Sequence, residues 1–143
     1  MKILIGLDGS PGSHNALRWV AEHGPALDAQ IIAALVVPRS EIWELASVQI
    51  DSGPALARRR AHLEGDWTDP LRAVGLRVTT RLLRGEPGAQ LCKLAETRAA
   101  DLLVIGAKSH SAVPHLLGGT AHKVANHARC PVLLVTAPDR KKR

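Results

Sequence analysis

Aromatic residues are scarce in this chain of 143 residues, which has three tryptophans and neither phenylalanine nor tyrosine. The core must therefore be built from valine, isoleucine, leucine and alanine, and the hydrophobic content of 45% is typical of a globular domain. The formal net charge is +6, but no aromatic residues alternate with the basic ones to stack on bases. We therefore expect no specific nucleic-acid binding, and only weak nonspecific contact stays open.

Long hydrophobic runs, targeting signals and paired cysteines are also missing. The run at 31–37 is only of strand length, so we expect no membrane span. The N-terminus lacks the apolar region and cleavage pattern of a signal peptide. Cys92 and Cys130 lie far apart without metal-type spacing, which favours two reduced, mostly buried thiols in a cytoplasmic protein.

The motifs of several enzyme classes are absent as well. The chain has no Walker A lysine motif, no GxSxG elbow, no HExxH helix and no CxxC pair. The histidines at 110, 115, 122 and 127 do not have the spacing that would place them together on one helix face. The sequence therefore predicts no metal site and no catalytic residue.

Apolar strands alternate with amphipathic helices along the whole chain. Buried strands are expected at Lys2–Leu7, Gln30–Val37, Asp101–Gly106 and Pro131–Val135, and a half-exposed edge strand at Leu76–Leu83. Helices are expected from Ser13 to about His23, from Pro54 to about Val74, from about Pro87, and from about Gly118. This order predicts an α/β fold with one open, doubly wound, five-stranded parallel sheet and helices on both faces.

Some local features carry expectations of their own. Ser13 is expected to cap the first helix, and Pro70 to kink or split the second near Thr68–Asp69. Trp67 falls on an apolar stripe with Leu63, Leu71 and Val74, so we expect it in the core and not in a ligand site. The connection Arg39–Gly53 is too apolar for a free linker, and is either a loop packed on its own domain or a partner surface.

The stretch from Asp101 to Val135 carries the candidate site. Its strand ends at Gly106, and Gly119 and Thr120 stand at the start of the next helix. The unpaired N–H groups of a helix start suit phosphate oxygens, and no acidic residue lies between Asp101 and Asp139. Glycine-rich turns also occur where a chain merely turns tightly, so the pattern alone leaves both readings open.

Ligands of such sheets bind beyond the carboxyl ends of the strands, where the strand order reverses. The two loops expected to meet there are Asp8–Gly12, after the first strand, and Gly106–Thr120, after the fourth. Both loops contain the small residues that a ligand cleft needs.

Three stretches resemble the universal stress protein family: ILIGLDGSPGSHNAL, LLRGEPGAQLCKLAETRAADLLVIGA and LLGGTAHKVANHARCPVLLV. The resemblance covers essentially the full length. It implies a Rossmann-like fold of the adenine nucleotide alpha hydrolase type, with strand order 3-2-1-4-5 in a domain over 1–138 and a basic tail at 139–143. It also implies a homodimer through Pro131–Val135, and pairing that edge strand would remove an aggregation hazard.

ATP-binding members of the family are similar in carrying glycine, two residues, glycine, nine residues, and then glycine with serine or threonine. Gly106 fills the first position, and Gly119 and Thr120 fill the last two with the same spacing, but Ser109 replaces the middle glycine. A serine donates its N–H and its hydroxyl to a phosphate, yet it adopts a positive φ only at a cost. The family also includes members that hold no nucleotide.

The resemblance extends to two further positions. Asp8 matches the acidic residue beside the nucleoside, and Val36 the residue whose backbone meets the adenine edge. The alternatives are an Asx turn for Asp8, an ordinary strand residue for Val36, and a helix cap for Thr120.

The resemblance implies an ATP-binding sensor or regulatory module of the stress response, with an unknown protein partner. Asp8 could also hold Mg²⁺ and Lys108 could reach a phosphate, but no residue is identifiable as a general base. Two alternatives stay open: a dimeric scaffold without nucleotide, and a very slow ATPase.

Overall fold

The computed structural model describes residues 1–39, 52–107 and 117–137. Lys108, Ser109, most of the connection Arg39–Gly53 and the basic tail lie outside the described residues. The elements are β1 (Lys2–Leu7), α1 (Pro11–His23), the 3-10 helix η1 (Pro25–Leu27), β2 (Gln30–Val37), α3 (Ser52–Glu64), α4 (Asp69–Ala73), β3 (Arg77–Arg84), α5 (Pro87–Thr97), β4 (Leu102–Gly106), α6 (Gly119–His127) and β5 (Val132–Val135).

The sheet confirms the predicted topology. Its five strands lie in the order β3-β2-β1-β4-β5, and all four neighbouring pairs are parallel. The order reverses at β1, which pairs with β2 on one side and with β4 on the other. The carboxyl ends of β1 and β4 therefore form the switch point where open α/β sheets bind ligands.

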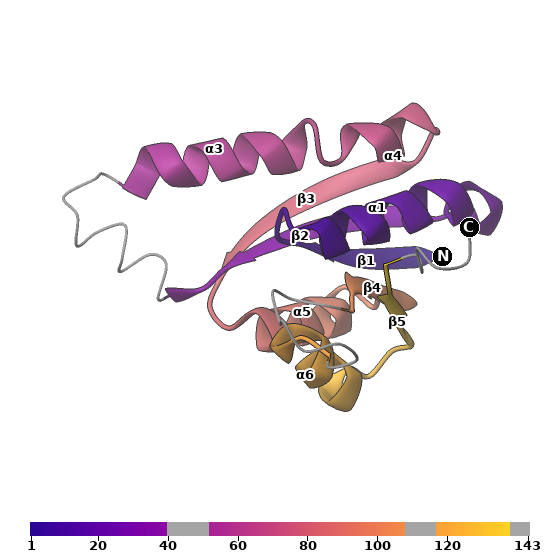
Figure 1. The fold of residues 1–143 in the computed structure, drawn as a ribbon. Coiled ribbons are helices and arrows are strands. Elements are labelled where there is room, and N and C mark those ends of the chain that lie inside the picture. Colours follow the sequence, from indigo (N-terminus) through magenta and orange to yellow (C-terminus); the bar gives the residue numbers. More distant parts are fainter. Residues whose placement is uncertain (40–51, 108–116, 138–143) are drawn as a thin grey trace.

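Alternate residues of β1 point into two separate cores, because successive strand side chains face opposite sides of a sheet. Ile3 and Ile5 pack with Val20 of α1 and Leu63 of α3, whereas Leu4 packs on the other face with α5 and α6. Figure 1 shows α1, α3 and α4 on one side of the sheet and α5 and α6 on the other. The predicted coverage of both faces is confirmed.

The first helix begins earlier than predicted, and the expected cap at Ser13 is wrong. The N-cap is Ser10, whose hydroxyl oxygen accepts a hydrogen bond from the Ser13 N–H at 3.2 Å. Pro11 occupies the first turn, where its missing N–H is no loss. Ser13 is buried inside the helix, and its hydroxyl donates to the Ser10 carbonyl at 3.0 Å.

The long predicted helix is split near Pro70, as expected. The chain leaves α3 at Glu64 and enters α4 at Asp69, and the buried Thr68 hydroxyl bridges the break by donating to the Leu63 carbonyl at 2.7 Å. Leu63 and Leu71 are buried as predicted, but Val74 is 45% exposed. Val74 faces outward because α4 ends at Ala73 and the periodic stripe does not extend beyond it.

The described helices include none that is both long and apolar enough to cross a membrane. Cys92 and Cys130 are unpaired and half-buried. Burial raises the pKa of both thiols, which suits structural cysteines better than nucleophilic ones.

Candidate nucleotide-binding site

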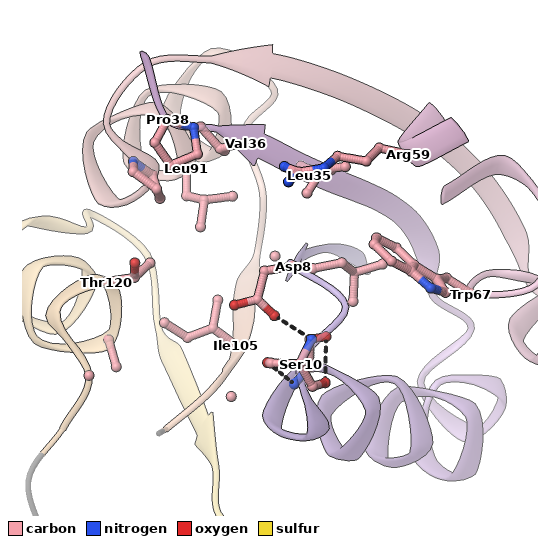
Figure 2. Close-up of a pocket in the computed structure, with 18 residues that line it drawn as sticks. Asp8, Ser10, Leu35, Val36, Pro38, Arg59, Trp67, Leu91, Ile105 and Thr120 are labelled. Carbon is pink, nitrogen blue, oxygen red and sulfur yellow. Dashed lines mark hydrogen bonds between the residues drawn. The ribbon is translucent and has the colours of Figure 1, made fainter. Parts of the chain in front are cut away.

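A pocket of about 380 Å³ opens at the carboxyl ends of β1 and β4. Its walls come from segments far apart in the sequence: Asp8 after β1, Val36 of β2, Leu91 of α5, Gly106 of β4 and Thr120 of α6. Figure 2 shows Asp8 between Ser10, on the α1 side, and Thr120, on the α6 side. The described ends of the two loops that the sequence placed at the switch point meet there: Asp8 and Ser10 after β1, and Gly106, Gly118 and Thr120 around β4 and α6.

Asp8 shapes the loop after β1. One carboxylate oxygen, Oδ1, accepts a hydrogen bond from the Ser10 N–H at 2.9 Å, which is the Asx turn considered as an alternative. The second oxygen, Oδ2, receives no hydrogen bond from the described part of the chain. An exposed carboxylate with one committed oxygen retains acceptor capacity for a ligand.

The Val36 carbonyl points toward the pocket side of β2. The next carbonyl, that of Val37, accepts a hydrogen bond from the Gly85 N–H at 3.0 Å, on the β3 side. Consecutive peptide groups of a strand point to opposite sides, so the Val36 carbonyl faces the β1 side. The β1–β2 register ends at Leu7 and Leu35, so this carbonyl lies beyond the last paired residue of β1.

The start of α6 has no side-chain cap. Gly118 is the N-cap residue, with φ −61° and ψ 158°, and its N–H donates to the Ala107 carbonyl at 3.1 Å. Thr120 lies inside the helix and lines the pocket, so it is not the cap. No other described residue accepts from the first-turn N–H groups of α6, so these groups are open to water or to a ligand.

Gly106 and Gly119, the two glycines of the motif, differ in the space available for a side chain. A Cβ at Gly106 would lie 2.6 Å from the carbonyl carbon of Gly12, so close packing of two backbones requires glycine there whether or not a ligand binds. A Cβ at Gly119 would meet nothing within 4 Å. Gly118, and not Gly119, lines the pocket.

Four of the six predicted site residues line the pocket: Asp8, Val36, Gly106 and Thr120. Gly119 stands between two lining residues without lining the pocket itself, and Ser109 lies outside the described residues. The described part of the chain has no group of three or more histidine, cysteine, aspartate or glutamate residues that could hold a metal ion.

Comparison with known proteins agrees with this geometry. The model of the universal stress protein family matches residues 1–136. The chain belongs to the universal stress protein family. The universal stress protein MJ0531 of Methanocaldococcus jannaschii is 29% identical to it over 98% of this chain and 84% of its own length. The chain spans about half, 47%, of the Mycobacterium tuberculosis universal stress protein Rv3134c.

Solved structures share the fold. The structure of the protein MJ0577 superposes with a TM-score of 0.82 over 96% of both chains, at 24% identity. A universal stress protein in complex with cAMP superposes with a TM-score of 0.71 over 95% of this chain and 96% of its own, at 25% identity. Adenine nucleotides are thus bound by at least one structural relative of this universal stress protein.

Trp67 and Arg59 are among the pocket residues of this universal stress protein that the sequence did not indicate. Trp67 packs against the core, as expected, and it also lines the pocket. A Cβ on Gly9 would lie 2.8 Å from the Trp67 ring, which places the indole against the loop that carries Asp8. Arg59 of α3 also lines the pocket. Helical spacing could not reveal that α3 packs on β2 and β3 and brings Arg59 to the pocket.

Most of the residues that line the pocket are apolar or glycine. Asp8 and Arg59 are the charged residues among the described ones that line it, and Ser10, Ser13 and Thr120 supply hydroxyls. An apolar cavity with a few convergent polar groups is the usual form of a small-molecule site.

Proposed function

We propose that this universal stress protein binds an adenine nucleotide, ATP, in the pocket between β1 and β4. The observation that carries the proposal is the convergence of Asp8, the Val36 carbonyl and the uncapped start of α6 on one cavity of about 380 Å³. The cAMP complex of a relative with the same fold supports the same class of ligand.

Each group has a chemical role in this proposal. The Val36 carbonyl accepts from the exocyclic amine of adenine, and the Asp8 carboxylate accepts from the ribose hydroxyls. The first-turn N–H groups of α6, with those of Gly119 and Thr120 among them, bind phosphate oxygens. Gly106 lets the β4 end pack closely on Gly12. Ser109 stays in the proposal as a second phosphate donor, and Mg²⁺ would be held with the phosphates and Asp8.

Binding of ATP would make the protein a sensor or regulatory module of the stress response, acting in the cytoplasm through a protein partner. Chromatography of the supernatant after heat denaturation of freshly purified protein tests the proposal directly. We expect an adenine nucleotide in the supernatant, or a calorimetric signal when ATP is added to the emptied protein. If the supernatant contains no nucleotide and the emptied protein gives no calorimetric signal with ATP, the proposal is refuted.

A dimeric scaffold without nucleotide is the second candidate, favoured by the edge strand β5. All four β5 residues are apolar and only half-buried in the single chain, and edge pairing with a second copy would cover them. In light scattering we expect a dimer that Leu133→Lys converts to monomer. If ATP binds only after Ser109→Gly, the scaffold replaces the nucleotide sensor.

Slow ATP hydrolysis would be a property of the same pocket. Phosphate release that survives unchanged in both Asp8→Ala and Gly119→Ala variants would come from a contaminant.

A further inference from the structure

The middle residue of the basic run Arg58–Arg60 differs from its two neighbours. Arg58 and Arg60 are exposed, whereas Arg59 is half-buried and lines the pocket. Leu56 and Leu63 of the same helix are buried, with exposed fractions of 8% and 1%. Positions three and four residues apart share a helix face, so Arg59 lies on the inward stripe of α3 between two core leucines.

The position of α3 beside the pocket is fixed at its carboxyl end. Thr68 ties the end of α3 to the chain that follows it, and the ring of Trp67 lies against Gly9 of the loop that carries Asp8. His62 stacks on Trp67 with ring centroids 5.9 Å apart. These contacts hold the carboxyl end of α3, the helix that carries Arg59, beside the pocket.

Arg59 and the start of α6 lie at opposite ends of the pocket. Figure 2 shows the Arg59 side chain extending from α3 toward Leu35 of β2, across Asp8 from Thr120. If the phosphates bind at the start of α6, the nucleoside would lie beside β2, next to the guanidinium of Arg59. A guanidinium has five N–H donors and no acceptor, so acceptor atoms such as the ring nitrogens of a purine would suit it.

We propose that Arg59 is a specificity-determining residue that donates hydrogen bonds to the purine of the bound nucleotide. This inference rests on the proposed nucleotide site. It adds that α3 contacts the purine end of the ligand through Arg59. Arg59 also takes part in an interaction within the chain, and its five donors serve both roles. Asp8 and Arg59 together would present an acceptor and a donor to the nucleoside, whereas the phosphates contact α6.

Calorimetric titration of adenosine, AMP and ATP into the wild type, Arg59→Ala and Arg58→Ala tests this inference. Loss of a hydrogen bond to a charged donor weakens binding by about ten- to a hundredfold. We expect Arg59→Ala to weaken all three ligands by the same factor, because all three carry the purine. The exposed control Arg58→Ala should bind like the wild type.

The possible results separate this inference from the proposed function. A wild type that binds none of the three ligands refutes both. A wild type that binds, with Arg59→Ala unchanged, refutes only the role of Arg59. If Arg59→Ala binds AMP and ATP more weakly but adenosine as tightly as the wild type, Arg59 contacts the phosphates. That result also refutes the purine role of Arg59. Arg59→Met, which keeps the apolar stem against Leu56 and Leu63, should repeat the loss if Arg59→Ala unfolds.

Discussion

The N-termini of α5 and α6 lie side by side at the pocket and are built in opposite ways. The Glu86 carboxylate caps α5, accepting from the N–H groups of Gly88 at 3.1 Å and Ala89 at 2.7 Å. The start of α6 has only Gly118 as its N-cap, without a side-chain hydrogen bond. Residues from both ends, Pro87 and Thr120, line the pocket.

The cap of α5 is also tied to α6. Lys123 of α6 lies 3.1 Å from the second oxygen of Glu86, and its aliphatic stem lies over Gly88. At the start of α5, the N–H groups of Gly88 and Ala89 have the Glu86 carboxylate as their acceptor. The start of α6 is held in place through Lys123, but its first-turn N–H groups stay available to a ligand. A carboxylate cap on α6 would repel phosphate, and no acidic residue lies anywhere from 102 to 138.

The largest effect is expected where the chain leaves β4 toward α6. Gly106→Ala places a Cβ against the backbone of Gly12, which cannot rotate away as a side chain can. We expect a loss of about 3 kcal/mol in the free energy of unfolding, measured by urea titration. Gly119→Ala, with open space at its Cβ, is the matched control and should stay within about 0.5 kcal/mol of the wild type. Equal stability of the two variants would contradict the packing account.

Removing the cap of α5 should have the next largest effect. Glu86→Ala leaves the N–H groups of Gly88 and Ala89 without their acceptor and should lower the free energy of unfolding by about 1 kcal/mol. Lys123→Met removes only an exposed ion pair and should change stability by less than about 1 kcal/mol. If Lys123→Met is the more damaging of the two, the ion pair and not the cap holds this region together.

The contribution of the cap should also depend on pH. Partial burial raises the pKa of the Glu86 carboxyl, but hydrogen bonds from Ala89, Lys123 and Gly88 together lower it more, so the net pKa lies below the ordinary value of 4.5. The added stability is present above the unfolded-state pKa and is lost as the pH falls through the folded-state pKa. The stability difference between wild type and Glu86→Gln should therefore be constant at neutral pH and shrink at acid pH. A difference that grows on acidification would contradict this sign.

Giving α6 a side-chain cap should have the smallest effect on stability, a slight increase, and should weaken ATP binding. Gly118 has an extended conformation that serine also adopts, so Gly118→Ser should raise the free energy of unfolding by a few tenths, about 0.3 kcal/mol. The new hydroxyl competes with phosphate for the first-turn N–H groups and should weaken ATP binding about fivefold. Gly118→Ala adds a Cβ but no acceptor. If Gly118→Ser binds ATP more weakly than Gly118→Ala does, the hydroxyl cap and not crowding by the Cβ is the cause.

The strand order and the burial of both sheet faces could be predicted because they depend on hydrophobic periodicity. The start of α1 was misplaced since Ser13 and Ser10 are both good caps. The signal that favours Ser10 is Pro11 in the first turn, where a proline loses nothing.

The site was only partly predictable. Gly106 was found, but the reason for it, contact with Gly12 some ninety positions earlier in the chain, is a tertiary fact that no local pattern contains. Arg59 and Trp67 escaped because their place in the wall depends on how α3 crosses the sheet. The inward stripe Leu56, Arg59 and Leu63 was nevertheless readable at helical spacing, and a basic residue on such a stripe is worth attention.

The most direct test of the nucleotide site is an ATP titration of the wild type, Asp8→Asn and Asp8→Ala, with thermal unfolding of each. An asparagine keeps the oxygen that accepts from the Ser10 N–H, so Asp8→Asn should preserve the Asx turn and the melting temperature. We predict that ATP binds the wild type and that both variants bind at least about tenfold more weakly, although only Asp8→Ala loses stability. ATP affinity that is unchanged in Asp8→Asn, or undetectable in the wild type, would contradict the account.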